Sequence, residues 1–182
     1  MKIFISGGCK NGKSWYAQHL AQASFARPLY YIATMKPADK EDDERILRHQ
    51  QEREGIGFIT VEQPVNIAEI LRFCDKKGSF LLDSLTALLA NEMFDSAGMV
   101  KHDAPQKLQQ ELSCILHEVR NIVIVSDYIY SDAIVYDELT ENYRRGLAML
   151  DRTAARLCDT VLEVSFTGVF VHRGEDGVVI DN

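Results

Sequence analysis

One short segment near the start of the chain constrains its fold more than any other feature. The pattern of a glycine, four residues and then Gly-Lys-Ser occurs once, at Gly7-Gly8-Cys9-Lys10-Asn11-Gly12-Lys13-Ser14. An apolar run at 2–6 precedes it and a helical pattern at about 12–24 follows it. Glycines allow backbone N–H groups to turn inward around phosphate oxygens, and the start of the next helix adds positive potential. The segment therefore predicts a phosphate-binding loop for a nucleoside triphosphate.

The side chains of this loop predict specific roles. Lys13 can reach the β- and γ-phosphates, and the Ser14 hydroxyl can ligate Mg²⁺. A carboxylate that ends another strand should complete the metal site. We expect this to be Asp83, after the apolar run 80–82, with Asp127 as the alternative because it follows the run 122–126. Either aspartate could instead cap a helix, since carboxylates favour that position.

Short apolar runs alternate with helical patterns along the whole chain. Strands are expected at 2–6, 29–33, 58–61, 80–83, 122–126, 161–164 and 169–171. Helices are expected at about 12–24, 39–54, 64–74, 84–97, 104–119 and 137–158. Continuous apolar strands are typical of a sheet that is buried on both faces. The alternation predicts one α/β domain, 1–182, with a mostly parallel sheet, helices on both faces and a C-terminal antiparallel hairpin.

Composition excludes several other classes of protein. The formal net charge of −7 disfavours general binding to nucleic acid, whose backbone attracts cationic surfaces. No apolar run is long enough to span a bilayer, and the chain does not begin with a secretion signal. The cysteines lack the spacing of a zinc or redox motif, which suits a reducing compartment. We therefore expect a cytoplasmic protein.

A histidine between two arginines marks the polar helical stretch at 39–54. Arg45, His49 and Arg53 are four residues apart in turn, so they share one face of a helix. The arginines could neutralise phosphate oxygens and hold His49 in its neutral, nucleophilic form. The alternative is a solvated face on which Glu41 simply pairs with Arg45.

Together these segments resemble the adenosylcobinamide kinase / adenosylcobinamide-phosphate guanylyltransferase family of cobalamin biosynthesis. The similarity covers the phosphate loop with its double glycine and four further segments. These are Tyr31-Ile32-Ala33-Thr34, then Arg45 to Arg53, then Thr60-Val61-Glu62, and finally Leu81 to Thr86 followed by Asn91. His49 falls on the histidine that becomes guanylylated in the family, and Asp83 falls in the segment that holds the metal.

The resemblance implies two group transfers. A kinase step would phosphorylate the aminopropanol arm of adenosylcobinamide, and His49 would then carry GMP from GTP to adenosylcobinamide phosphate. It also implies a homo-oligomer, a trimer in the family, with the nucleotide near a subunit interface. ATP and GTP are not distinguished. The catalytic residues would be Lys13, His49 and Asp83. The nucleotide would contact the phosphate loop (7–14), Ala33, Thr34, Met35, Arg45, Gln50, Gln51, Glu52, Arg53, Glu62 and Asp83.

The C-terminal half departs from the family pattern. Where the family has Asn-Glu-Val-Gly after the fifth strand, this chain has Asp127-Tyr128-Ile129-Tyr130. The last long helix carries Asp151-Arg152 where the family has Asn-Gln. Two alternatives therefore stay open. One is a P-loop kinase or nucleotidyltransferase of the same ancestry acting on another acceptor, and the other is a nucleotide-binding regulatory protein.

Overall fold

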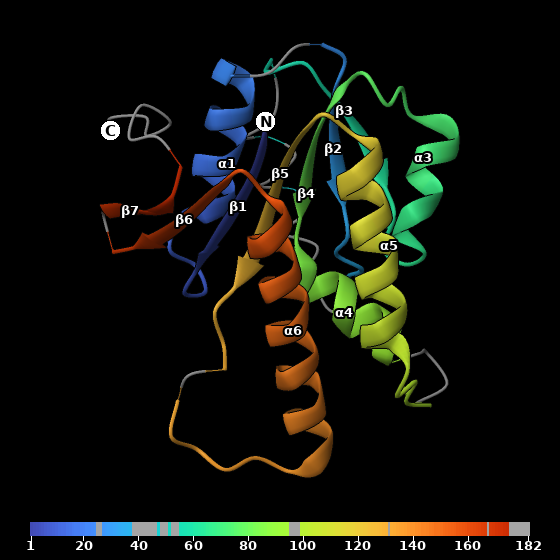
Figure 1. Cartoon of the computed structure of the whole chain (residues 1–182), viewed down its shortest axis with the longest axis vertical. Helices are drawn as coiled ribbons and strands as arrows, with labels where there is room; N and C mark the ends of the chain where they lie inside the picture. The colour runs from blue at the N-terminus through green and yellow to red at the C-terminus, as the bar shows by residue number, and fades with distance from the viewer. Residues whose placement is uncertain are drawn as a thin grey trace.

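A seven-stranded sheet forms the centre of the molecule (Figure 1). The computed structural model describes residues 1–24, 27–37, 47, 51, 55–94, 99–130, 132–166 and 168–174. The strands are β1 (Lys2–Gly7), β2 (Leu29–Ala33), β3 (Phe58–Glu62), β4 (Ser79–Asp83), β5 (Asn121–Asp127), β6 (Thr160–Ser165) and β7 (Gly168–Arg173). Their order is β3-β2-β4-β5-β1-β6-β7, and every pairing is parallel except β6–β7. The prediction of a mostly parallel sheet that ends in an antiparallel hairpin is confirmed.

Helices cover both faces of this sheet. They are α1 (Lys13–Ser24), a 3-10 turn η1 (Ile67–Glu69), α3 (Ile70–Phe73), α4 (Leu85–Met93), α5 (Ala104–Glu118) and α6 (Glu138–Leu157). Helix α1 packs on one face, whereas α3, α4, α5 and α6 pack on the other. Figure 1 shows that α6 begins well beyond the carboxyl ends of the strands and runs back along the sheet. None of the helices in the described segments has the length and apolar character needed to cross a membrane.

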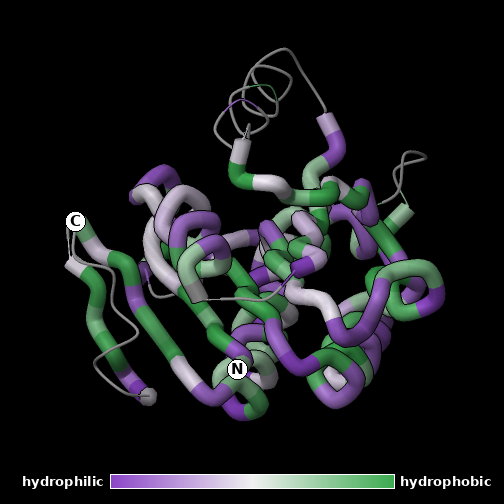
Figure 2. Tube along the Cα trace, turned by 90° about the horizontal axis from the view of Figure 1, so that it is seen from above, coloured by the Kyte–Doolittle hydropathy of each residue, from purple (hydrophilic) through white to green (hydrophobic). Residues whose placement is uncertain are grey.

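The alternation of side chains along each strand builds two separate cores. In β1, Ile3 and Ile5 face α1, whereas Phe4 faces α4, α5 and α6. Strand β5 divides in the same way, because Val123 packs with the first group and Ile124 with the second. The strands are therefore hydrophobic on both faces, as the continuous apolar runs predict. Figure 2 shows this concentration of hydrophobic residues along the strands, with more hydrophilic stretches in the surrounding helices.

Two predicted helices are too long. The helix expected at 64–74 begins only at η1, because Asn66 adopts a left-handed conformation with φ of 51°. The helix expected at 84–97 ends at Met93, and Phe94 instead forms an isolated antiparallel bridge with Val100. The helix expected at 39–54 lies almost wholly outside the described residues, although Leu47 and Gln51 are helical. For the helices expected at 64–74 and 84–97, a local backbone feature overrides a favourable side-chain pattern.

Helices α5 and α6 approach closely where α6 carries a glycine. A Cβ atom added to Gly146 would lie 2.9 Å from Pro105 Cγ and 3.3 Å from Leu89 Cδ2. Glycine in the middle of a helix costs about 1 kcal/mol relative to alanine, so its presence needs a compensating reason. The close contact with α5 and α4 supplies that reason.

We expect Gly146→Ala to lower the free energy of unfolding by about 1 kcal/mol. The gain in helix propensity of about 1 kcal/mol should be outweighed by overpacking, which costs about 1–3 kcal/mol in a dense core. Denaturant unfolding measures the difference. Ala148→Gly on the same helix gives mainly the propensity contribution, because that site is only half-buried. A Gly146→Ala variant more stable than the parent would show that the helices can separate freely.

Candidate nucleotide-binding site

The predicted phosphate loop connects the carboxyl end of β1 to the first turn of α1. A Cβ atom at Gly7 would overlap the Val164 carbonyl oxygen and lie 2.6 Å from Asn11 Nδ2. Gly12 has φ of +90°, a conformation that side-chain-bearing residues rarely adopt. The Asn11 side chain donates to the Val164 carbonyl on β6, which fixes the loop against the neighbouring strand. Two of the three glycines are thus required by close approach or by backbone conformation.

Lys13 lies across this loop with its ammonium group fully engaged. Its side chain is only 5% exposed. The Nζ atom donates to the Gly8 carbonyl at 2.5 Å, to Asp127 Oδ1 at 2.8 Å and to Asn11 Oδ1 at 3.2 Å. Binding of a triphosphate through Lys13 therefore requires exchange of these partners for phosphate oxygens. The ion pair with Asp127 is the strongest of them, because both groups are charged and partly shielded from water.

The two aspartates proposed for the metal site lie at the same edge of the sheet but differ in their partners. Asp127 ends β5, which is adjacent to β1, and its Cα is paired with that of Gly7. Asp83 ends β4, one strand further away, and accepts a hydrogen bond from Tyr31 Oη at 2.8 Å. Asp83 forms no ion pair with any other described residue, whereas Asp127 is already neutralised by Lys13. Of the two carboxylates, Asp83 is thus the one whose charge is available to a cation.

The residues predicted to contact the rest of the nucleotide lie at or just after the carboxyl ends of β2 and β3. Ala33 and Glu62 are directly paired at the ends of these strands, so they lie at the same edge as the phosphate loop. Three strand spacings of about 4.8 Å separate β2 from β1, which is roughly 14 Å. A nucleotide that touches both regions must therefore lie across the carboxyl ends of β4 and β5.

Thr34 has a structural task that the sequence does not show. Its side chain is completely buried. Its hydroxyl donates to the Ser84 carbonyl at 2.9 Å and accepts from Ser84 N–H at 2.7 Å, and its own carbonyl accepts from Asn91 Nδ2 at 2.6 Å. Thr34 thus fixes the turn that presents Asp83, while its neighbour Met35 is half-buried at the edge.

Several predicted site residues lie outside the described part of the chain. These are Arg45, His49, Gln50, Glu52 and Arg53. Gln51 is described as a helical, exposed residue. The placement of the proposed nucleophile relative to the phosphate loop therefore stays a prediction.

The segment between β5 and α6 is held by one buried arginine that sequence reasoning did not single out for this role. Arg144 is 7% exposed. Its guanidinium donates to Asp132 Oδ1 at 2.8 Å, to Glu141 Oε1 at 2.6 Å and to the Ile129 carbonyl at 3.3 Å. It also lies 4.7 Å from the centre of the Tyr136 ring. These contacts fix the chain that follows Asp127 against the first turns of α6.

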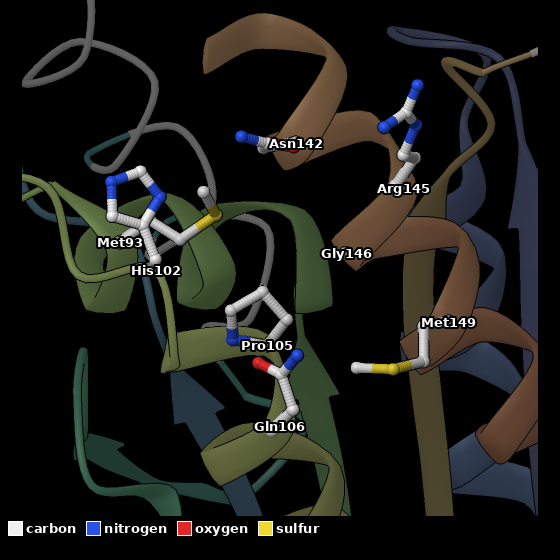
Figure 3. A pocket seen from close by; sticks show the side chains of 8 residues that line it. All are labelled: Met93, His102, Pro105, Gln106, Asn142, Arg145, Gly146 and Met149. Carbon is white, nitrogen blue, oxygen red and sulfur yellow. The ribbon is translucent and has the colours of Figure 1, made fainter. Parts of the chain in front are cut away.

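Two cavities that are lined by described residues flank α6. The first, of about 270 Å³, lies between α6, the end of α4 and the start of α5. Figure 3 shows Asn142 and Arg145 projecting from α6 on one side, with Met93 and His102 on the other. Among the described residues, no buried polar atom without a hydrogen-bond partner lines it, so we assign it no role. The second cavity lies on another face of α6, beside β1 and β6.

The fold of the chain is similar to that of two solved archaeal structures. A KaiC-like protein from Pyrococcus horikoshii OT3 superposes with a TM-score of 0.52 at 13% identity, over 96% of this chain and 80% of that one. Another protein from the same archaeon gives a TM-score of 0.52 at 8% identity, over 97% and 88% of the two chains. These likenesses concern the fold alone. Together with the loop at 7–14 they define a P-loop NTPase fold, as predicted from the sequence.

The sequence assigns the chain more narrowly within this class. Residues 3–171 match the family model described as cobinamide kinase / cobinamide phosphate guanyltransferase. The bifunctional adenosylcobalamin biosynthesis protein CobP of Pseudomonas aeruginosa is 31% identical over 166 residues, 88% of this chain and 91% of that protein. The corresponding protein CobU of Escherichia coli is 25% identical over 181 residues, 93% and 98% of the two chains. The chain belongs to this family of transferases, and the predicted family is confirmed.

We expect Asp127→Asn to bind a nucleoside triphosphate about tenfold more tightly in the absence of Mg²⁺, which corresponds to about 1.4 kcal/mol. The variant removes the carboxylate that competes for Lys13, and it removes a negative charge beside the expected phosphate position. Calorimetric titration measures the affinity. Lys13→Ala should lose binding, and Asp103→Asn, an exposed aspartate before α5, should change nothing.

Weaker binding by Asp127→Asn would contradict this interpretation. It would mean that Asp127 supports the bound nucleotide directly. If the loss appeared only with Mg²⁺ present, Asp127 rather than Asp83 would be the metal-binding carboxylate.

Proposed function

We propose that the chain phosphorylates adenosylcobinamide and then transfers GMP from GTP to the resulting adenosylcobinamide phosphate through a guanylyl-histidine at His49. Membership of the family supports both steps. The observation that carries the proposal is the phosphate loop with the Lys13 ammonium at its centre and two carboxylates at the same sheet edge. We propose a cytoplasmic homo-oligomer with no nucleic-acid partner.

In the kinase step the hydroxyl oxygen of the acceptor attacks the γ-phosphorus of ATP or GTP. The bond between that phosphorus and the β–γ bridging oxygen breaks, the nucleoside diphosphate leaves, and the hydroxyl proton is released. Lys13 offsets the charge that builds on the β- and γ-phosphate oxygens, and the inward N–H groups of the loop hold those oxygens in place. A fixed cation and fixed dipoles act without reorganisation at the moment of transfer.

In the transferase step an imidazole nitrogen of His49 attacks the α-phosphorus of GTP, and pyrophosphate leaves. A phosphate oxygen of adenosylcobinamide phosphate then attacks the same phosphorus, which forms a P–O–P bond and frees the histidine. Neutral imidazole is the nucleophilic form, and its ordinary pKa of about 6.5 leaves it mostly neutral near pH 7. Arg45 and Arg53 on the same helical face would offset the charge on the α-phosphate.

Ser14 and Asp83 would hold a magnesium ion at the phosphate loop. Mg²⁺ prefers oxygen ligands and keeps several waters, so one hydroxyl and one carboxylate beside a triphosphate are an adequate donor set. Asp83 has one oxygen oriented by Tyr31 Oη and no cation partner among the described residues. When bound, the ion would neutralise charge on the transferred phosphoryl group.

Incubation with α-labelled GTP and Mg²⁺ should leave label covalently attached at His49. The resulting P–N bond should be acid-labile and alkali-stable, which separates it from a serine or threonine ester. His49→Ala should lose the label while still binding GTP, because the phosphate loop is a separate part of the site. Intact-mass and peptide mass spectrometry measure the label and its position.

Other outcomes of the labelling experiment point to other functions. Label that persists in His49→Ala would mean that another residue is the nucleophile. Bound GTP without any label in the parent protein would favour a plain kinase on another acceptor. Bound GTP with neither label nor phosphoryl transfer would favour a regulatory nucleotide-binding protein.

Asp83→Asn should lower turnover by about two orders of magnitude, the scale of a few kcal/mol of lost transition-state stabilisation, with a much smaller effect on triphosphate affinity. Tyr31→Phe, which removes the hydroxyl that orients Asp83, should act in the same direction but more weakly. Steady-state kinetics over a range of Mg²⁺ concentrations measure both. Normal turnover in Asp83→Asn would remove Asp83 from the metal site.

A further inference from the structure

The second cavity beside α6 has the features of a binding site that the phosphate loop does not account for. Its volume is about 390 Å³, and its walls come from β1, β6, β7, α6 and the segment after β5. The polar and aromatic side chains that line it include those of Ser6, Tyr128, Tyr130, Asp151, Arg152, Glu163 and His172. It lies on the side of the sheet covered by α6, opposite α1.

Asp151 is a buried carboxylate in the wall of this cavity, and one of its oxygens lacks a hydrogen bond of good geometry. It is 3% exposed, and burial raises its pKa to about 6. Its Oδ2 atom accepts from Tyr130 Oη at 3.0 Å. The Ser126 hydroxyl lies near enough to favour the ionised form, but no hydrogen bond of good geometry reaches Oδ1 from any described residue. At neutral pH Asp151 is mostly ionised, so its buried Oδ1 atom lacks a donor of good geometry.

The surroundings of Asp151 restrict what could supply that donor. An ionised carboxylate only accepts hydrogen bonds, so the ligand must present an N–H or O–H group. Arg152 lines the same cavity as the acids Asp151 and Glu163, so the lining carries charges of both signs. A neutral carboxamide suits both the carboxylate and the guanidinium. Its N–H can donate to Asp151, and its carbonyl can accept from Arg152. Tyr128 and Tyr130, with ring centres 4.7 Å apart, supply apolar surface beside it.

The position of the cavity relates it to the transferred phosphate. Ser6 in its wall immediately precedes Gly7 of the phosphate loop. Tyr128 in its wall follows Asp127, whose carboxylate contacts Lys13, and its N–H donates to the Gly7 carbonyl at 2.8 Å. A ligand held here would lie against the strand that carries the loop. In the proposed reaction the acceptor is the second substrate that has to be held beside the triphosphate.

We propose that this cavity binds a carboxamide side arm of the corrinoid acceptor, with Asp151 Oδ1 accepting a hydrogen bond from the amide N–H. This inference rests on the proposed function, because the ligand is the acceptor of that reaction. Cobinamide carries several neutral carboxamide arms besides the one that bears the hydroxyl. Asp151 is thus a specificity-determining residue that holds the acceptor and takes no part in bond making.

Equilibrium binding of adenosylcobinamide, followed by its visible absorbance or by dialysis, tests the proposal without requiring turnover. Asp151→Asn keeps the shape of the side chain and removes its charge, and we expect the Kd for adenosylcobinamide to rise about tenfold. GTP affinity and labelling at His49 should stay unchanged. The melting temperature should stay equal or rise, because an unpaired buried charge is removed. The matched control is Glu138→Gln, an exposed acid on the same helix.

A second test compares the binding of adenosylcobinamide with that of an analogue in which one side arm is hydrolysed from carboxamide to carboxylate. The parent protein should bind the matching analogue much more weakly than adenosylcobinamide, because two carboxylates would face each other. Asp151→Asn should reduce this discrimination. Tyr130→Phe, which removes the hydroxyl that orients Asp151, should weaken binding of adenosylcobinamide a few-fold and serves if Asp151→Asn does not fold.

The proposal is overturned if adenosylcobinamide binds Asp151→Asn and Tyr130→Phe as tightly as the parent. It is also overturned if Asp151→Asn only lowers the melting temperature and leaves discrimination between the two acceptors unchanged, as a purely structural residue would. Failure of the proposed function has a different signature. In that case the parent would bind adenosylcobinamide without transferring phosphate or GMP to it, or would bind none at all.

Discussion

The ion pair between Lys13 and Asp127 connects the two central strands of the sheet at the point where chemistry is expected. Strand β5 carries Asp127 and strand β1 leads into Lys13, so the pair closes the phosphate loop against the neighbouring strand. The same strand end continues into the segment that Arg144 fixes to α6. The phosphate loop, the β5–α6 connection and the cavity beside Asp151 are therefore parts of one connected structure.

The phosphate loop and the strands could be predicted because their signals are local. A tight glycine turn and a continuous apolar run each specify their own backbone, whatever lies around them. The pairing of Lys13 with Asp127 could not be predicted, since the two residues are 114 positions apart and meet only because β5 lies next to β1. Sequence reasoning identified Asp127 only as a metal-site alternative and gave no reason to connect it with Lys13.

Some residues have roles that depend on the packed structure, and the sequence alone does not reveal those roles. Thr34 resembles a nucleotide contact by its position after β2, yet its hydroxyl is used twice in fixing Ser84. The segment 64–74 has a helical pattern, yet the left-handed backbone at Asn66 delays the helix. Asp151 reads as one polar residue on an amphipathic helix, and only the fold shows that it is buried with an unpaired oxygen. Burial is a property of the packed structure and leaves little trace in a single sequence.

Several residues at which the C-terminal half departs from the family pattern lie close together in the structure. Tyr128, Tyr130, Asp151 and Arg152 come from two separate segments, but all of them line the same cavity. Tyr130 also donates a hydrogen bond to Asp151, so these two departures are coupled to each other. A protein that had lost its acceptor would have no reason to keep a buried carboxylate with one poorly satisfied oxygen, because a neutral residue there would be more stable. We therefore interpret the differences as an altered way of holding the acceptor, in line with the site proposed at Asp151, and not as loss of the acceptor site.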